Sequence, residues 1–262
     1  MKLSISNIAW PAENNDSVYK LMKRYGFTGL EIAPTIIFPE NPYEQCSEAR
    51  KWNKALFHEH AFSVSSMQSI WYGRQENIFS SAEERSILLE YTKKAIDFAS
   101  DIKCRNLVFG CPKNRNVPAG KTADAAPQFF FELGEYAISK GTVIALEPNP
   151  PIYNTNYIND TEAAFDLVNI VDSSGFKLNL DVGTMIYNRE QASLIKGRVS
   201  LINHVHISEP GLLAIKRKKL HEELAEYLNN EEYGGFVSIE MGKQEDISVI
   251  ENALKFVKRI FK

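Results

Sequence analysis

The sequence predicts a single (β/α)8 barrel, the TIM-barrel fold, over residues 1–262. Short β-prone runs alternate with helix-patterned segments along the whole chain, and eight pairs can be counted. Strict alternation favours a parallel sheet with right-handed crossovers, and eight such units close into a barrel. The length suits one barrel domain, because no linker-like segment interrupts the chain. An open doubly wound sheet is the alternative, but the phosphate-binding patterns GxGxxG and GxxxxGK[ST] that such sheets often carry are missing.

Each predicted strand is a short run rich in apolar and β-branched residues, and each is followed by a longer amphipathic segment. Local signals support several boundaries: Asp16 can cap the first helix, and Gly26 and Gly141 can end the first and fourth. The strands are expected at residues 3–8, 29–32, 62–68, 106–110, 142–147, 176–181, 201–206 and 236–240. The helices are expected at residues 16–25, 44–60, 82–102, 122–140, 161–172, 189–196, 220–229 and 247–261.

Composition and charge point to an ordinary globular protein with a small-molecule partner. Hydrophobic residues make up 44% of the chain, and the net charge of -3 argues against a broad nucleic-acid surface. No apolar run is long enough for a membrane span, and the N-terminal MKLSISNIAW lacks the apolar core of a secretion signal. The three cysteines have no metal-type spacing and an odd count, which favours a reducing compartment. The cytoplasm is therefore the expected location.

Polar residues recur at the ends of the predicted strands, where parallel strands of a barrel converge on one mouth. The fifth strand, for example, is an apolar run that ends on a carboxylate and is then stopped by prolines, in the segment IALEPNPP. A lone charge at such a position is costly unless something pairs with it. The polar strand ends are Glu31, Gln68, Glu147, Asp181, His206 and Glu240.

Four of these residues form a predicted metal site. Glu147, Asp181 and Glu240 would repel one another in a shared mouth unless their pKa values rose or a cation neutralised them. Together with His206 they offer three hard oxygen ligands and one imidazole nitrogen, which suits Mn²⁺ or Mg²⁺, with Co²⁺ or Zn²⁺ possible. We expect a divalent metal, most simply Mn²⁺, at this place.

The segments LEPNPP, LDVG, HVHISE and SIEM, in this order and spacing, resemble the metal-ligand strand ends of the xylose isomerase-like TIM barrels. That superfamily of sugar isomerases and epimerases includes ketose 3-epimerases, hydroxypyruvate isomerases, inosose dehydratases and endonuclease IV. The resemblance extends from GLEIAP to SIEM, so it covers nearly the whole chain. It implies that Glu147, Asp181, His206 and Glu240 bind the metal, and that Glu147 and Glu240 are also the catalytic acid/base pair.

The resemblance implies a divalent-metal-dependent isomerase or epimerase of a sugar, sugar derivative or polyol. In such an enzyme the C–H next to the substrate carbonyl is acidified, and the metal stabilises the resulting enediolate. One carboxylate removes the proton and the other returns one to the opposite face.

The sequence departs from the superfamily pattern at positions that handle the substrate. Thr184 stands where many members have histidine, and Tyr153 and Leu212 stand where ketose 3-epimerases have glutamate and arginine. These departures leave the metal ligands intact and indicate altered substrate contacts. The residues expected to contact substrate are Trp10, Glu31, Gln68, Tyr153, Thr184, Glu209 and Lys243, and Trp71 and Tyr72 could also wall the pocket.

Three other functions stay open at this point. A keto-polyol dehydratase would share the first proton abstraction, and a ligand-binding member could have kept the pocket without turnover. A DNA-repair endonuclease needs several metals and a basic groove, which five histidines and a net charge of -3 do not favour. The sequence leaves open the substrate's identity, its phosphorylation and the oligomeric state, although an oligomer is possible.

Overall fold

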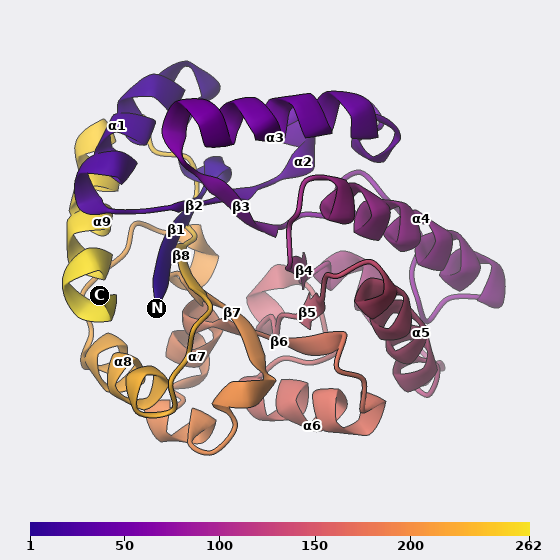
Figure 1. Cartoon of the computed structure of the whole chain (residues 1–262). Coiled ribbons are helices and arrows are strands. Elements are labelled where there is room, and N and C mark those ends of the chain that lie inside the picture. The colour runs from indigo at the N-terminus through magenta and orange to yellow at the C-terminus, as the bar shows by residue number, and fades with distance from the viewer.

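The computed structural model describes residues 1–262 as one closed barrel of eight parallel strands inside a ring of helices (Figure 1). Each strand pairs with the next along the chain, and the ring closes where Leu3 on β1 lies opposite Val237 on β8. The single-domain TIM barrel predicted from the sequence is therefore confirmed. The strands are β1 (Lys2–Ser6), β2 (Gly29–Ile32), β3 (Ser63–Met67), β4 (Leu107–Phe109), β5 (Ile144–Leu146), β6 (Phe176–Asp181), β7 (Ile202–Ile207) and β8 (Phe236–Ile239).

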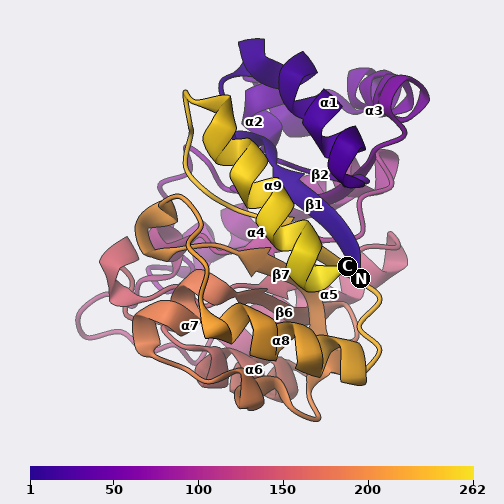
Figure 2. The ribbon, with the colours of Figure 1, turned by 90° about the vertical axis from the view of Figure 1, so that its left-hand side faces the viewer.

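The helices cover the outside of the barrel, and the C-terminal helix α9 packs beside α1 across the closing strands (Figure 2). None of the helices is both long and apolar enough to cross a membrane. They are α1 (Asn15–Tyr25), α2 (Pro34–Ile37), α3 (Cys46–His60), α4 (Ala82–Asp101), α5 (Ala126–Ser139), α6 (Thr161–Val171), α7 (Val182–Asn188), α8 (Lys219–Asn230) and α9 (Ile247–Phe261).

Local chemistry explains where several helices begin and end. The side chain of Asp160 accepts a hydrogen bond from the amide of Ala163 and so caps α6, and Asp246 caps α9 in the same way through Ser248. Helix α1 ends at Gly26, whose φ of 74° is in the left-handed region that glycine adopts without a steric penalty. The apolar faces of these helices pack on the strands in one continuous core.

One predicted helix is wrong. We expected a helix at residues 189–196, but α7 occupies Val182–Asn188 and begins directly at the end of β6. Asp181 causes this early start, because its side chain accepts a hydrogen bond from the amide of Thr184 and caps the helix. Arg189 then ends α7 with a φ of 58°, and only a short 3-10 turn at Ala192–Ile195 follows. The other predicted helices and strands are present, with the largest boundary error at the start of α5.

Candidate active site

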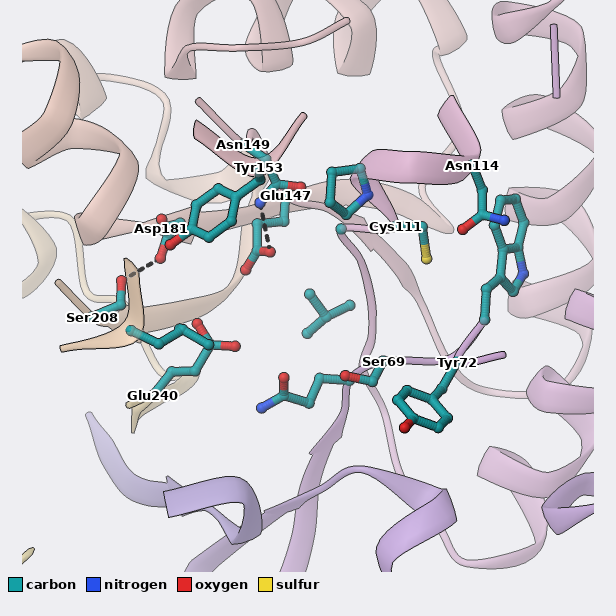
Figure 3. A pocket seen from close by; sticks show the side chains of 16 residues that line it. Ser69, Tyr72, Cys111, Asn114, Glu147, Asn149, Tyr153, Asp181, Ser208 and Glu240 are labelled. Carbon is teal, nitrogen blue, oxygen red and sulfur yellow. Dashed lines mark hydrogen bonds between the residues drawn. The ribbon is translucent and has the colours of Figure 1, made fainter. Parts of the chain in front are cut away.

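Four polar side chains from the last four strands converge at the C-terminal mouth of the barrel. Glu147 and Glu240 directly follow β5 and β8, while Asp181 and His206 lie near the ends of β6 and β7. One potential ligand atom from each lies within 4.8 Å of the others, and all four side chains are buried. Figure 3 shows Glu147, Asp181 and Glu240 pointing toward one another at one end of a cavity. The barrel therefore brings together the residues that the sequence proposed as metal ligands.

The imidazole of His206 bridges two groups of carboxylates. Its Nδ1 lies 2.8 Å from Glu147 Oε1 and 3.2 Å from Glu240 Oε2, and its Nε2 lies 2.9 Å from Glu31 Oε2. Burial opposes protonation of this ring, but the charges of Glu240 and Glu31 outweigh it and hold the pKa of His206 well above its usual value. His206 is thus the basic side chain that pairs with both Glu147 and Glu240.

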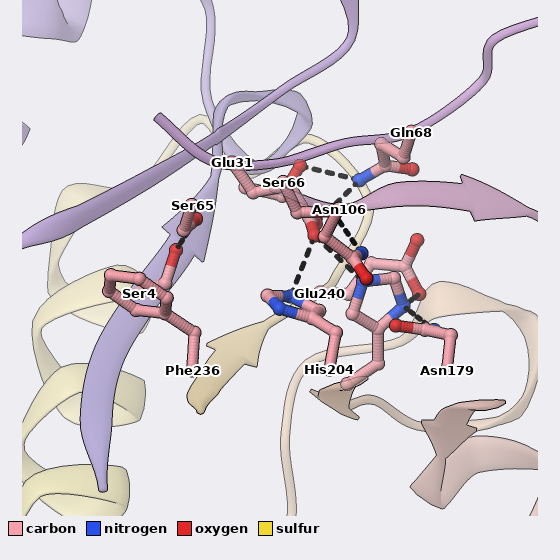
Figure 4. A network of polar contacts seen from close by, with 12 residues as sticks. Ser4, Glu31, Ser65, Ser66, Gln68, Asn106, Asn179, His204, Phe236 and Glu240 are labelled. Carbon is pink, nitrogen blue, oxygen red and sulfur yellow. Dashed lines mark hydrogen bonds and ion pairs between the residues drawn. The ribbon is translucent and has the colours of Figure 1, made fainter. Parts of the chain in front are cut away.

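Glu31 lies behind His206 and does not line the cavity. Its side chain is 0% exposed, and Oε1 accepts a hydrogen bond from Gln68 Nε2 at 3.1 Å (Figure 4). His204 Nε2 lies 3.0 Å from Glu31 Oε2, the same oxygen that contacts His206. Burial alone would raise the pKa of Glu31, but the two imidazoles lower it strongly. Glu31 therefore lies outside the cavity lining, and its contact with His206 Nε2 places it where it can orient that ring.

Both oxygens of Asp181 are held by neighbouring groups. Ser208 Oγ donates to Oδ1, and the amide of Thr184 donates to Oδ2 at 2.7 Å. The Thr184 hydroxyl lies 2.8 Å from both Asp181 Oδ2 and Pro148 O, so its single proton is shared between two acceptors. Burial and the charge of Glu147 raise the pKa of Asp181 to about 6. Thr184 is fully buried and, contrary to expectation, supports Asp181 from outside the cavity.

Two carboxamides fix the carboxylate of Glu147. Asn179 Nδ2 donates to Oε1 at 2.8 Å, and Asn149 Nδ2 donates to Oε2 at 3.1 Å. The glycine at the end of β4 leaves room for this carboxylate, because a Cβ added at Gly110 would lie 2.8 Å from Glu147 Oε2. Glu147 is therefore held in a single orientation toward the other carboxylates.

A buried arginine supports the same strand end. Arg115 is 0% exposed, and its Nη2 donates to the carbonyl oxygen of Glu147 at 2.9 Å and to Asn149 Oδ1 at 2.7 Å. Burial lowers the pKa of Arg115 to about 10, which leaves the guanidinium charged at neutral pH. Arg115 thus anchors Asn149, which in turn anchors Glu147.

The donor set fits a divalent cation. Three buried carboxylates face one imidazole, and no lysine or arginine lines the cavity to balance them. Burying this excess of negative charge is costly without a cation. Oxygen-rich sites with one imidazole suit Mn²⁺ or Mg²⁺ better than a thiolate-preferring metal. The residues that could hold the ion are Glu147, Asp181, His206 and Glu240.

A cavity of about 270 Å³ opens beside the carboxylates (Figure 3). Glu147, Asp181 and Glu240 form one end, and Ser69, Tyr72 and Asn114 from the loops after β3 and β4 lie at the other. The cavity is lined by Gln68, Ser69, Trp71, Tyr72, Val108, Gly110, Cys111, Pro112, Asn114, Glu147, Asn149, Tyr153, Asp181, Ser208, Leu212 and Glu240.

Several residues singled out in the sequence do line this cavity. Gln68, Trp71 and Tyr72 follow β3, and Tyr153 lies in the loop after β5. The hydroxyl of Tyr153 accepts a hydrogen bond from the amide of Gly211 at 2.9 Å, which ties the loops after β5 and β7 together next to Leu212. Tyr153 and Leu212 therefore form an uncharged part of the cavity wall.

Three other candidates lie elsewhere. Trp10 is buried outside the cavity, where its indole N–H donates to Asn15 Oδ1 at 2.7 Å. Glu209 is buried and accepts a hydrogen bond from the amide of Lys216, so it organises its own loop. Lys243 is exposed, and its Nζ lies 3.6 Å from Glu245. The structure does not place Trp10, Glu209 or Lys243 in contact with the cavity.

Sequence reasoning missed several residues of the site. Asn149 and Ser208 each lie two positions after a proposed ligand, Glu147 and His206, so the two-residue alternation of extended chain could have indicated them. Arg115 had no such signal, because a buried arginine in a loop looks like an ordinary surface charge in the sequence.

Comparisons with known proteins agree with this architecture. A family model described as "Xylose isomerase-like TIM barrel" matches residues 19–260. No curated protein shows detectable sequence similarity. Solved structures with a similar fold include a D-psicose 3-epimerase from Clostridium cellulolyticum H10 with D-tagatose (TM-score 0.79, 18% identity, 100% of both chains). A 3-keto-D-glucoside 4-epimerase from E. coli has a TM-score of 0.76 at 19% identity over 99% of both chains. A family 2 AP endonuclease from Brucella melitensis has a TM-score of 0.73 at 18% identity over 99% of both chains. At these identities the likeness concerns the fold.

Proposed function

The chain belongs to the xylose isomerase-like TIM barrel family, and from that premise we propose that it is a divalent-metal-dependent isomerase or epimerase of a sugar, sugar derivative or polyol. The observation that carries the proposal is the convergence of Glu147, Asp181, His206 and Glu240 within 4.8 Å at one end of the cavity. Similar folds among sugar epimerases support the choice of substrate class.

Glu147, Asp181, His206 and Glu240 would hold the ion, with Mn²⁺ as the simplest choice. When bound, the ion would polarise the substrate carbonyl and acidify the neighbouring C–H bond. The protein's own groups then handle the proton. Glu147 and Glu240 come from β5 and β8, which lie apart in the ring, so their carboxylates can address the reacting carbon from different directions.

In the proposed reaction one of these two carboxylates removes the proton from carbon, and the planar enediolate of the substrate forms. The other carboxylate returns a proton to the opposite face, which inverts that centre, or to the adjacent carbon, which interconverts aldose and ketose. Trp71, Val108 and Leu212 line the cavity with apolar surface that limits the access of water to the reacting carbon.

An endonuclease function has less support, although one protein of similar fold is an AP endonuclease. A DNA backbone requires a basic surface, and no lysine or arginine lines the cavity of this chain. Glu31, which contacts both His204 and His206, is fully buried and could not contact a bound duplex.

The proposal is tested by metal content and hydrogen exchange. The protein is stripped with a chelator, reloaded with Mn²⁺ and analysed for bound metal, with about one ion per chain expected for a single four-ligand site. Deuterium incorporation from D2O into D-tagatose, D-fructose, an inosose and hydroxypyruvate is then followed by NMR. Exchange in the loaded protein and its loss after stripping support the proposal. A loaded protein that exchanges no hydrogen in any of these compounds would contradict it.

A further inference from the structure

We propose that the cavity selects an uncharged polyhydroxy substrate and discriminates against phosphate esters and carboxylic acids. This inference rests on the proposed function, since it names the substrate class for the same site. It follows from the charges and from the hydrogen-bonding directions of the groups that line the cavity.

The charge of the lining is entirely negative. It contains the carboxylates of Glu147, Asp181 and Glu240 and no lysine, arginine or histidine. A bound divalent ion would offset two of these three charges, which leaves a net negative charge on the protein groups around a ligand. The nearest guanidinium, Arg115, is buried outside the lining and already donates to Glu147 O and Asn149 Oδ1.

The basic stretch at residues 216–219 does not supply the missing charge either. Lys218 lies 3.5 Å from Glu209, and Arg217 and Lys219 pair with glutamates of helix α8 at 2.6 Å. None of the four basic residues lines the cavity. This stretch therefore brings no phosphate-binding group to the cavity.

The side-chain donors of Gln68, Asn114 and Trp71 are already used. Gln68 Nε2 donates to Ser6 Oγ at 2.5 Å and to Glu31 Oε1 at 3.1 Å, which occupies both of its protons. Asn114 Nδ2 donates to the carbonyls of Arg74 at 3.2 Å and Glu76 at 2.7 Å. The single indole proton of Trp71 is held by Thr92 Oγ1 at 2.8 Å.

Gln68 and Asn114 therefore offer acceptors to a ligand. The donors left in the lining are all uncharged: one N–H of Asn149 and the hydroxyls of Ser69, Tyr72 and Tyr153. Gln68 and Asn114 each keep a carbonyl oxygen without a protein partner, and the carboxylates add more acceptor sites. Sugar hydroxyls can donate to all of them. A phosphate or carboxylate group has only acceptor oxygens, so it would lose its water and gain only uncharged donors, with no cationic side chain to offset its charge.

The first test compares matched neutral and anionic ligands. Binding of D-fructose and D-fructose 6-phosphate to the Mn²⁺-loaded protein is measured by calorimetry, in parallel with deuterium exchange into each. A phosphate that lacks two charge-assisted hydrogen bonds from the protein loses enough binding free energy to lower affinity about 100-fold. We therefore expect D-fructose 6-phosphate to bind at least about 100-fold more weakly than D-fructose. Equal or tighter binding of the ester, or no binding of either compound, would overturn the inference.

A charge-adding variant provides the converse test. Ser69 lies at the end of the cavity away from the carboxylates, so Ser69→Lys places an ammonium there. We expect its preference for D-fructose over the phosphate ester to fall by about 10-fold. Ser63→Lys makes the same substitution at the exposed first residue of β3, at the end of the barrel away from the cavity. It should leave the preference unchanged. An unchanged preference in Ser69→Lys, or an equal change in Ser63→Lys, would count against the inference.

The two proposals fail in different ways. If neutral sugars bind and phosphate esters do not, but no hydrogen exchanges, then the isomerase function is wrong and the inferred ligand class stands. If exchange occurs faster on the phosphate ester, the isomerase function stands and the inferred ligand class is wrong.

Discussion

At the scale of single residues, the two proposed catalytic carboxylates have different surroundings. Glu147 accepts from Asn179 and Asn149 and contacts His206, whereas Glu240 contacts only His206 among the polar groups of the site. Burial, with the charges of Asp181 and Glu31, raises the pKa of Glu240. Each carboxylate is nevertheless needed in the proposed proton transfer.

Glu147→Gln and Glu240→Gln should therefore each reduce deuterium exchange by about 10²–10⁴-fold, the usual contribution of a general acid or base. Exchange rates are measured together with bound Mn²⁺, so that loss of metal is separated from loss of proton transfer. Glu245→Gln, an exposed glutamate in the loop after β8, is the matched control. The two-carboxylate mechanism is wrong if both variants keep full turnover.

Glu31 provides a second prediction at this scale. Because it contacts His206 Nε2 from behind, it orients the ring so that Nδ1 faces Glu147 and Glu240. Loss of such a partner usually lowers metal affinity by about 10–100-fold. Glu31→Gln keeps the side-chain volume and should show this drop in calorimetric Mn²⁺ titrations, with a circular dichroism spectrum like that of the unaltered protein. Unchanged affinity would refute the orienting role.

At the scale of elements, the turn from β6 into α7 combines structure and function. Asp181 caps the helix through the amide of Thr184 and at the same time presents its carboxylate to the proposed metal site. The Thr184 side chain holds both Asp181 and the loop after β5, because its hydroxyl lies 2.8 Å from Pro148 O. Displacement of this helix start would therefore move a ligand.

We expect Thr184→Val to lower the free energy of unfolding by about 1–2 kcal/mol, because it removes the hydroxyl donor to Pro148 O and one of the two donors to Asp181 Oδ2. Thr184→Ser keeps the hydroxyl and should recover most of this loss. Urea unfolding of the two variants measures the difference, and Mn²⁺ titration should show weaker binding in Thr184→Val only. Equal stability of the two variants would show that the hydroxyl contributes nothing.

This turn also shows where sequence reasoning reached its limit. Most strands and helices could be predicted because hydrophobic periodicity and helix-ending glycines such as Gly26 are local signals. The predicted cap Asp16 is wrong, because α1 begins one residue earlier with Asn14 at its N-cap position. The segment at residues 189–196 was misassigned because α7 begins without any loop, through a cap supplied by the last residue of a strand. In the site, the proposed ligands could be found from strand ends alone, whereas the burial of Glu31 behind His206 and the role of Arg115 depend on tertiary contacts.

At the scale of the whole molecule, the carboxylate cluster should make the metal-free protein sensitive to pH. The pKa values of Asp181, at about 6, and of Glu240 and His206 are all raised in the folded state. All three groups bind protons more tightly when folded, so their contribution to stability is largest at low pH and decreases as pH rises through these values. The lowered pKa of Glu31 acts in the opposite direction only under strongly acidic conditions.

The metal-free protein should therefore be more stable at about pH 5.5 than at about pH 7.5, with Asp181 alone accounting for about 1 kcal/mol. For a chain of this size that corresponds to a few degrees in Tm. Thermal unfolding in a chelator measures the difference, and Asp181→Asn should reduce it. Mn²⁺ should raise Tm more at the higher pH, where the ligands are deprotonated. A metal-free Tm that increases with pH over this interval would contradict the cluster electrostatics.

The two ends of the cavity are formed by residues from different halves of the chain. Residues at or after the ends of β5, β6 and β8 form the acidic end, and residues after β3 and β4 form the opposite end. Substitutions at Ser69, Tyr72 and Asn114 can therefore reshape the ligand-facing wall while the proposed ion-holding groups in the later half stay unchanged. This separation makes the earlier half a natural target for directed evolution. It would let variants with new specificities be selected from combinatorial libraries without rebuilding the reactive centre.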